Sequence, residues 1–322
     1  MVEINKYVEL IQVLLYLAKM QEKTRQQIFN INYVISINNY FKEFEAHEAV
    51  VLTKDLIINH WFTHITPLRA ILYLQEILND VDSYKDIKNF MLERNISSDK
   101  LKNWAIAVNR FIVDSNFQTF FLSQKNYYSM IVDMVKSWEY DKWIGKIEKY
   151  FSSNFHRFKL IICPLNGNYG FILDKPEINT SYVVRCLPYY DREGNITWEK
   201  EFFAKGVAHE FAHCFVNPIV EDNKQILDNH KPFFDKHSNM LNSYNVPYAV
   251  INEYWVRAFA IRFMEINKDF FPLFDIQAEY NRQNEYFMYI DKFVEMLKVY
   301  EKSSVSFEEF YLNNISSVLN ID

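Results

Sequence analysis

The chain has 322 residues and 49% of them are hydrophobic, which is enough to bury a substantial core and excludes disorder as the main state. Its 35 Lys and Arg residues are outnumbered by 41 Asp and Glu residues, and the resulting net charge of -6 argues against nucleic-acid binding. Only 5 glycines occur, and the sequence contains neither GxxxxGKS/T nor GxGxxG, the usual loops for nucleotide phosphates.

The most apolar stretch near the N-terminus, Ile11 to Ala18, is too short to span a bilayer. It lacks a preceding basic segment and a small-residue cleavage site, so it predicts an amphipathic helix rather than a secretory signal. We expect no membrane insertion and a cytoplasmic location, although an exported protein without its signal would look the same. The odd number of cysteines favours free buried thiols, whereas a bridge between Cys163 and Cys186 would suit an exported protein.

Residues 1–155 are predicted to form an all-helical domain. Gly145 and Pro67 are the only glycine and proline before residue 160, and apolar residues recur at helical spacing in several stretches. These stretches are Tyr7–Leu17, Tyr33–Phe44, Leu68–Leu78, Leu101–Val113, Tyr127–Trp138 and Trp143–Phe151. Ser97 and Asp141 precede two of them and are expected to cap helices.

Residues 156–322 are predicted to combine strands with helices. Runs rich in Ile, Val, Phe and Tyr indicate strands, and the turn residues between them favour antiparallel pairing. The strand runs are Phe158–Cys163, Tyr169–Leu173 and Ser181–Leu187, and helical spacing returns in Phe202–Phe215, Tyr248–Ile266, Tyr280–Tyr300 and Phe307–Leu319. We expect the first of these helices to end at Asn217 and Pro218. The fold class is therefore α+β, predominantly helical, with a small antiparallel sheet.

Residues 209–213 read HEFAH, an HExxH motif inside a predicted helix. Residues four apart share one helix face, so His209 and His213 can bind the same metal ion. Glu210 would lie beside a metal-bound water, where a general base is needed. The alternative is a chance match on an amphipathic helix. Another pair at this spacing, His60 and His64, lacks both the glutamate and an evident third ligand.

A catalytic zinc ion needs a third protein ligand and one open coordination position. A histidine in the continuation HxxGxxH is excluded, because Val216 and Ile219 occupy the positions of its glycine and its histidine. Glu253 is the better candidate, since it lies in a strongly apolar helical stretch where a carboxylate needs a cation as partner. That cation would be zinc or Arg257, one turn later.

An HExxH motif followed by an Asn-Glu pair on a downstream helix resembles the gluzincin metallopeptidases. The resemblance implies a zincin-like domain in which His209, His213 and Glu253 hold Zn²⁺ while Glu210 acts as the general base. Thermolysin-like members have an aspartate four residues after the ligand glutamate, where this chain has Arg257. The strings HEFAHCFVNP, LNGNYG and NEYWVRA also resemble an uncharacterised bacterial family, a domain of unknown function interpreted as a metallopeptidase, across the whole chain.

Other polar residues close to the motif compete for a role at the metal, and we expect them in a loop. They are Glu221, Asp222, His230 and His237. The two acidic residues would be solvated or would orient the metal-binding histidines, and the two histidines would be exposed or would stabilise the transition state.

The predicted mechanism is attack by a metal-bound water on a carbonyl carbon, with Glu210 taking the proton and returning one to the leaving amine. A further side chain must stabilise the oxyanion. The candidates for that role are Arg257, Tyr248, Tyr254 and His230. Arg257 would equally well only neutralise Glu253.

An extended peptide substrate would pair with an exposed strand at the edge of the sheet. The segment Asn166–Phe171 is the expected edge, and Asn168, Tyr169 and Gly170 are the predicted substrate-binding residues, because glycine permits close approach of another backbone. An ordinary hairpin turn would explain the glycines equally well.

The sequence thus predicts zinc-dependent hydrolysis of a peptide or protein substrate. The main alternative is a non-catalytic protein whose helical half binds a partner protein and whose histidines hold a structural ion or none. Hydrolysis of a non-peptide amide by the same water chemistry is a third hypothesis.

Overall fold

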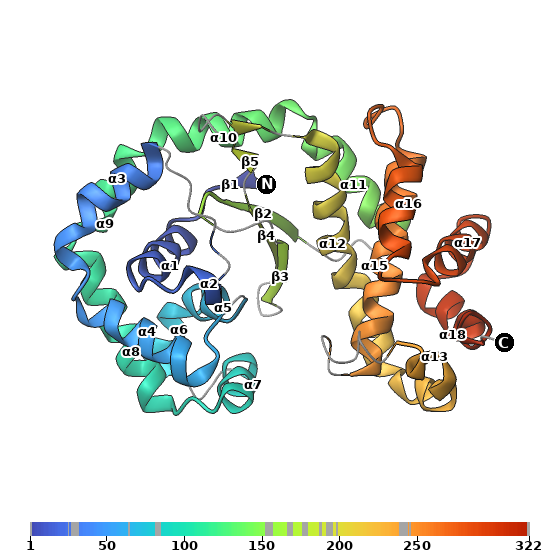
Figure 1. The fold of residues 1–322 in the computed structure, drawn as a ribbon, viewed down its shortest axis with the longest axis horizontal. Coiled ribbons are helices and arrows are strands. Elements are labelled where there is room, and N and C mark those ends of the chain that lie inside the picture. The colour runs from blue at the N-terminus through green and yellow to red at the C-terminus, as the bar shows by residue number, and fades with distance from the viewer. Residues whose placement is uncertain are drawn as a thin grey trace.

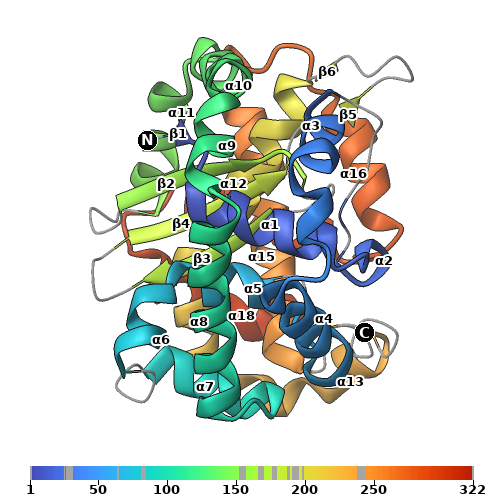
Figure 2. The same ribbon diagram turned by 90° about the vertical axis from the view of Figure 1, so that its left-hand side faces the viewer.

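The structure is a computed structural model in which helices predominate, as the sequence predicts (Figure 1). It describes residues 2–24, 26, 32–63, 65–80, 85–151, 157–165, 170–175, 180–186, 189–190, 196–197, 199–237, 244 and 246–320. A small sheet lies between two groups of helices, one formed by the first half of the chain and one mainly by the second half (Figures 1 and 2).

Between residues 6 and 150 the described chain is mostly helical, and each predicted helical stretch lies in helical structure. The stretch Leu68–Leu78 is divided between two helices, and Tyr33–Phe44 ends in a short 3-10 helix. The helices are α1 (Lys6–Leu17), α2 (Gln21–Thr24), α3 (Asn32–Phe41), η1 (Lys42–Phe44), α4 (Glu48–His60), α5 (Ile65–Leu72), α6 (Leu74–Asp80), α7 (Lys85–Arg94), α8 (Ser98–Asp114), α9 (Phe117–Ser123), α10 (Lys125–Ser137) and α11 (Tyr140–Tyr150). Ser97 caps α8 by accepting a hydrogen bond from the Lys100 amide, as expected. Asp141 does not cap α11, because that helix begins at Tyr140 and its N-cap residue is Glu139, in a left-handed conformation.

The main sheet contains β1 (Val2–Glu3), β2 (Arg157–Cys163), β4 (Thr180–Cys186) and β3 (Gly170–Lys175), in that spatial order. The prediction of an antiparallel sheet is wrong for most of it, since β1, β2 and β4 run parallel and only β3 pairs antiparallel, with β4. A separate antiparallel pair joins β5 (Tyr189–Tyr190) to β6 (Ile196–Thr197).

Strands β2 and β3 follow each other in the sequence and run in opposite directions, but they do not pair with each other. The backbone of β4 pairs on both sides, for example at Val183 with Leu160 of β2 and with Ile172 of β3. A strand with two partners satisfies both rows of its backbone polar groups, which local turn chemistry cannot reveal. As a consequence, β3 lies at the edge of the sheet.

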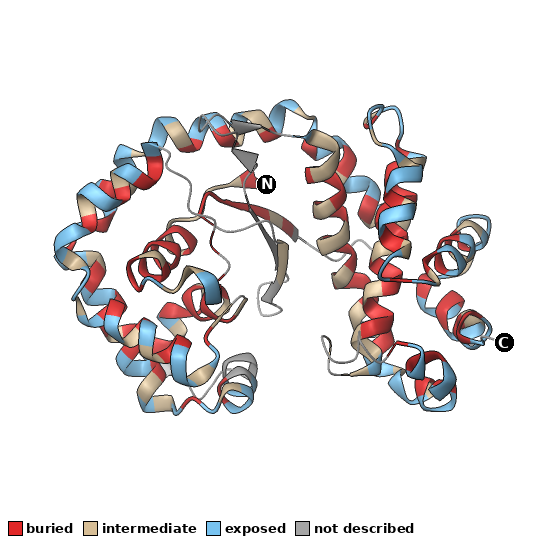
Figure 3. Cartoon of the chain, viewed as in Figure 1, coloured by how far each residue is buried: buried red, intermediate tan, exposed pale blue. Residues whose placement is uncertain are grey.

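Strand β2 separates two hydrophobic cores. Leu160 and Ile162 belong to one core and the alternate residues Ile161 and Cys163 to the other, as expected for a strand buried on both faces. The first core is built around the helices of the second half but also takes in α10 and α11, and the second core holds the remaining helices of the first half (Figure 3). The proposed boundary between residues 155 and 156 stays a prediction.

Helices resume after the strands, and their bounds correct two predictions. They are α12 (Lys200–Asp222), η4 (Lys224–His230), α13 (Lys231–Asp235), α15 (Pro247–Ile266), α16 (Ile276–Asn284), α17 (Ile290–Tyr300) and α18 (Phe307–Leu319). Helix α12 continues through Pro218 instead of ending there, since proline removes one hydrogen bond while Val216 and Val220 on either side of it stay buried. The stretch predicted as one helix over Tyr280–Tyr300 is divided between α16 and α17.

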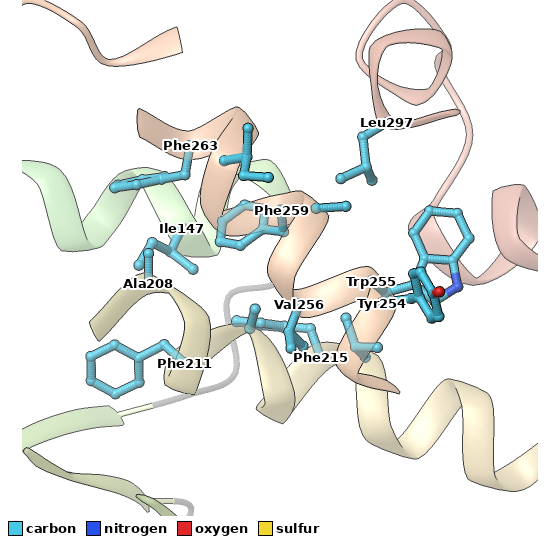
Figure 4. Close-up of a cluster of buried hydrophobic side chains, with 14 of the residues drawn as sticks. Ile147, Ala208, Phe211, Phe215, Tyr254, Trp255, Val256, Phe259, Phe263 and Leu297 are labelled. Carbon is cyan, nitrogen blue, oxygen red and sulfur yellow. The ribbon is translucent and has the colours of Figure 1, made fainter. Parts of the chain in front are cut away.

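Helices α12 and α15 pack against each other through large apolar side chains (Figure 4). Phe211 and Phe215 of α12 lie in the same buried cluster as Val256 and Phe259 of α15, with Ile147 of α11 beside them. Burial of these residues fixes the rotation of both helices about their axes. The polar residues of α12 and α15 discussed below are therefore held in a defined relative position.

Two of the cysteines, Cys163 and Cys214, are buried thiols outside any disulfide. Within the described ranges, no helix has the length and apolar character needed to cross a membrane.

Candidate metal centre

His209 and His213 lie one turn apart on α12, with their ring centroids 5.0 Å apart. The Nδ1 atom of His213 is 2.9 Å from Oδ1 of Asn217, a further turn along the same helix. An Nδ1–H that donates to this amide oxygen leaves a lone pair on Nε2, which is the form of histidine that binds a metal. From the sequence, Asn217 was assigned no role at the metal. Its position four residues after His213, on the same helix face, could have indicated one.

Glu253 of α15 reaches both imidazoles, as the third-ligand prediction requires. Its Oε1 atom is 3.7 Å from Nε2 of His213, and its Oε2 atom is 3.8 Å from Nε2 of His209. The side chain of Glu253 is 15% exposed, so it is largely removed from water but not closed off. Two residues separated by forty positions in the sequence thus meet through the packing of α12 on α15.

Arg257 lies one turn after Glu253 and binds its carboxylate. Its Nε and Nη2 atoms are 2.9 and 2.8 Å from Oε2 of Glu253, and its Nη1 atom donates to Oε1 of Gln283 at 3.2 Å. The guanidinium also stacks on the ring of Phe287. Burial alone would lower the pKa of Arg257, but the charge of Glu253 and the neighbouring Tyr244 hold that pKa above its usual range. Arg257 is therefore a permanent cation beside the carboxylate.

Glu210 faces the edge strand of the sheet. A Cβ atom added to Gly170, the first residue of β3, would lie 2.6 Å from Cγ and 2.7 Å from Oε1 of Glu210. No side chain fits at Gly170 unless the Glu210 carboxylate moves. The predicted substrate-binding residue Gly170 and the predicted base are thus in direct contact.

Two carboxylates compete for the place of a third ligand beside the histidines. The ligand atoms of His209, Glu210 and His213 all lie within 4.8 Å of one another, so these three residues form a group that could hold a metal ion. Glu253 has one oxygen within 3.8 Å of each imidazole and is fixed by Arg257. Either carboxylate completes a nitrogen and oxygen donor set.

The centre opens into a cleft with a volume of about 510 Å³. Its walls come from β3, α12, α15 and α16, and they include Gly170, Phe171, Lys205, His209, Glu210, His213, Tyr244, Glu253, Arg257, Glu279, Arg282 and Gln283. A second cavity of about 460 Å³ shares Tyr244, Arg257, Arg282 and Gln283 with the first. The cleft is large enough for a few residues of a peptide.

Several residues proposed as donors or ligands have partners elsewhere. Nε2 of His230 is 3.2 Å from the Ser316 hydroxyl, and Nε2 of His237 is 2.5 Å from the hydroxyl of the buried Tyr254. Neither His230 nor Tyr254 lines the cleft, and the same is true of Tyr248. Asn168 and Tyr169 lie outside the described residues.

The segment expected to be a loop is largely helical, because α12 extends beyond Pro218. Glu221 and Asp222 are the last residues of α12, and His230 ends η4. Burial raises the pKa of Glu221, which is hydrogen-bonded to Asn252, the residue before Glu253. This contact ties the end of α12 to α15 behind the metal centre.

Tyr244 is a cleft residue that the sequence did not reveal. It is hydrogen-bonded to Arg257, and burial, followed by the charge of Glu253, raises the pKa of its hydroxyl. The hydroxyl therefore stays protonated and able to donate. Tyr244 lies between helices, where no periodic pattern marks it.

The other histidine pair gives no comparable group. His60 ends α4, and its Nε2 atom is 2.8 Å from Nζ of Lys100, while His64 lies outside the described residues.

An HExxH helix that could hold a metal ion, inside a mostly helical fold, defines a candidate metal-binding protein. Residues 1–316 match the family model described as "Domain of unknown function (DUF4932)", and the chain belongs to this family. No curated protein and no solved structure matches the chain. The family description covers the metal centre and both cores, and it assigns no activity.

Proposed function

We propose that this protein is a zinc-dependent hydrolase of peptide bonds, with His209, His213 and Glu253 as the metal ligands. The observation that carries the proposal is the Glu253 carboxylate, whose oxygens lie 3.7 and 3.8 Å from the two imidazole Nε2 atoms. Two imidazoles and one carboxylate are a common ligand set of catalytic zinc. Ligand atoms of a tetrahedral zinc ion lie roughly 3.3–3.4 Å apart, so each imidazole Nε2 would need to approach its nearest Glu253 oxygen by only a few tenths of an ångström.

Glu253 is the preferred third ligand over Glu210. Arg257 binds the Glu253 carboxylate through Nε and Nη2 and holds it in place. Glu210 is turned towards Gly170 on the edge strand, which is where a substrate would lie. Asn217 would orient His213 for metal binding.

Zinc at this centre would supply a coordinated water whose pKa is lowered to about 7. Glu210 would accept a proton from that water and deliver it to the leaving amine. Tyr244 is the proposed oxyanion donor, because its raised pKa keeps its hydroxyl protonated and it lines the cleft. Arg257 is already committed to Glu253 and Gln283, so its proposed contribution is to position Glu253.

The edge strand favours a peptide over other amides. β3 pairs with β4 on one side and lies at the edge of the sheet, and its residues Gly170 and Phe171 line the cleft. An extended peptide could add to this edge through main-chain hydrogen bonds, which brings one of its carbonyl groups close to Glu210.

The test is Glu210→Gln, compared with the wild type after both are loaded with zinc. We expect stoichiometric zinc in both proteins, and an approximately 1,000-fold loss of hydrolysis in the variant, measured on peptide libraries and on non-peptide amides in parallel. Glu201→Gln, in the first turn of the same helix, is the matched control and should retain full activity.

Unchanged turnover in Glu210→Gln would refute the mechanism. A wild-type protein that binds zinc but cleaves nothing would favour the non-catalytic alternative, with a structural ion. Cleavage confined to the non-peptide amides would favour the third hypothesis.

A further inference from the structure

A single buried carboxylate holds two cations beside the metal centre. Glu279 of α16 accepts hydrogen bonds from Nζ of Lys205 at 3.0 and 3.1 Å, and from Nε and Nη2 of Arg282 at 3.0 and 2.6 Å. Nε2 of Gln283 donates to the same carboxylate at 2.7 Å. The side chains of Lys205 and Glu279 are only 10% and 8% exposed. The Glu279 carboxylate is thus saturated with donors.

This cluster is connected to the metal centre through Gln283. The Gln283 amide donates to Glu279 and accepts from Arg257, which in turn binds Glu253. A side-chain amide that both donates and accepts in fixed directions defines the position of its neighbours. Arg282 is therefore held in a defined place relative to the metal centre.

The charges along the cleft do not cancel once a metal ion is bound. Among the described residues that line it, the cations are Lys205, Arg257 and Arg282, and the carboxylates are Glu210, Glu253 and Glu279. The protein groups alone sum to zero, so a divalent ion would leave two positive charges in excess. In a partly desolvated cleft such an excess attracts an anionic group of the substrate.

Arg282 is the cation placed to meet that group. Lys205 and Arg257 are largely buried against their carboxylates, whereas the side chain of Arg282 is 51% exposed and lines both cavities. Among the described residues its hydrogen bonds go to Glu279 through Nε and Nη2, and Nη1 makes none. A guanidinium fork with donors left over fits a second carboxylate.

We propose that Arg282 binds a carboxylate of the substrate, so that this protein cleaves peptides close to a carboxylate group. The inference rests on the proposed hydrolase function and specifies its substrate class. Arg282 lines the same cleft as His209 and His213, and a cleft of about 510 Å³ holds only a few residues of an extended peptide. The carboxylate would therefore lie within a few residues of the bond that is cut. It would belong either to the peptide C-terminus or to an acidic side chain.

The activity test uses three tetrapeptide libraries with randomised neutral positions. One has a free C-terminal carboxylate, one has a C-terminal amide, and one has a C-terminal amide and a single glutamate. We expect the zinc-loaded wild type to cleave one or both carboxylate-bearing libraries at least tenfold faster than the neutral amides, and the preferred library identifies the source of the carboxylate. In Arg282→Gln, kcat/KM for that library should fall about 10- to 100-fold, and kcat/KM for neutral amides should change less than twofold.

The matched control is Arg110→Gln, which removes an exposed arginine paired with Glu48 on a distant helix. It should leave the preference intact. Arg282→Lys keeps the charge but loses the fork, so it should recover only part of the preference. A wild type that cleaves neutral amides as well as carboxylates, or a preference that survives Arg282→Gln, overturns the proposal.

A binding measurement separates this inference from the hydrolase proposal. Zinc-loaded Glu210→Gln, which should not turn over, is equilibrated with the same libraries, and retained peptides are identified by mass spectrometry after ultrafiltration. We expect retention of carboxylate-bearing peptides that disappears in Glu210→Gln combined with Arg282→Gln. Equal retention of neutral amides would refute Arg282 as a carboxylate site. Carboxylate-dependent retention without any wild-type hydrolysis would refute the hydrolase proposal alone.

Discussion

Glu9 and Glu253 are both carboxyl groups that folding removes from bulk water. The partners of Glu9 are neutral, whereas Glu253 lies beside a cation. Glu9 of α1 has no exposed surface, and its partners are the neutral hydroxyl of Tyr33 and the thiol of Cys163. Burial raises the pKa of Glu9 to about 8. Glu253 lines a cleft and is bound by the guanidinium of Arg257.

This difference indicates which kind of buried carboxyl group can bind a metal ion. A carboxyl group among neutral partners takes up a proton, and a protonated group is a poor ligand. A carboxylate held by a cation beside two imidazoles can complete a ligand set. An acidic residue in an apolar stretch of sequence is therefore not itself evidence of a metal site, because its neighbours decide its charge.

The largest effect on zinc affinity should come from Glu253→Gln, which replaces the carboxylate by a neutral amide. We expect the dissociation constant for zinc to rise roughly 1,000-fold, more than the 10- to 100-fold typical of a residue that only supports a ligand. Competition with a chelator of known affinity measures it. Glu9→Gln is the control and should bind zinc like the wild type; a loss of equal size there would contradict the distinction between the two sites.

Gly170→Ala tests the contact between the edge strand and Glu210. The added methyl group would force the Glu210 carboxylate aside, so we expect at least a 100-fold fall in kcat with zinc affinity unchanged. Stability should change little, since the displaced atoms are the end of a flexible side chain. Gly145→Ala has open space around it and serves as the control. Full activity in Gly170→Ala would remove Glu210 from the proposed mechanism.

Asn217→Ala should weaken zinc binding about tenfold, because His213 would lose the hydrogen bond that directs Nε2 towards the metal. Calorimetric titration of the metal-free protein with zinc measures this change. Asn314→Ala in α18 removes an amide that donates to a helix carbonyl four residues earlier, and should leave the affinity unaltered. Identical affinities for Asn217→Ala and the wild type would show that His213 needs no such support.

A further prediction concerns the pH dependence of stability through Glu9. Between its ordinary pKa of 4.5 and about 8, the folded protein keeps a proton that the unfolded chain has released. Stability from this group is therefore complete below about pH 4.5 and is lost as the pH rises through about 8, by up to about 1.4 kcal/mol per pH unit. Glu9→Gln should have a flatter profile in urea unfolding from pH 5 to 8. A slope equal to the wild type would mean that Glu9 is ionised in the folded state.

The sequence predicted the parts of the centre that local patterns encode. HExxH places two histidines on one helix face, and the apolar flanks of Glu253 indicate a second buried helix that needs a partner cation. Gly170 was expected to allow close approach of a substrate backbone, which stays a prediction, and the structure places the Glu210 side chain against it.

Features that depend on tertiary packing could not be predicted. The insertion of β4 between β2 and β3 changes most of the sheet from antiparallel to parallel, although β2, β3 and β4 were recognised as strands; β1 was not predicted. The link from Gln283 to Arg257 joins the successive helices α16 and α15 across 26 residues, and it has no local signature. Tyr254 and His230 were candidate oxyanion donors, but Tyr254 is hydrogen-bonded to His237 and His230 is hydrogen-bonded to Ser316 of α18.

The alternation of side chains along β2 has a consequence for cooperativity. Leu160 and Ile162 insert into the core that supports α12 and α15, while Ile161 and Cys163 insert into the core of the helical half. Strand β2 thus packs against both cores, and unfolding of either core would remove packing contacts from the other. We expect a ligand at the centre to slow amide hydrogen exchange in α1 as well as in α12, so that the two halves melt as one unit.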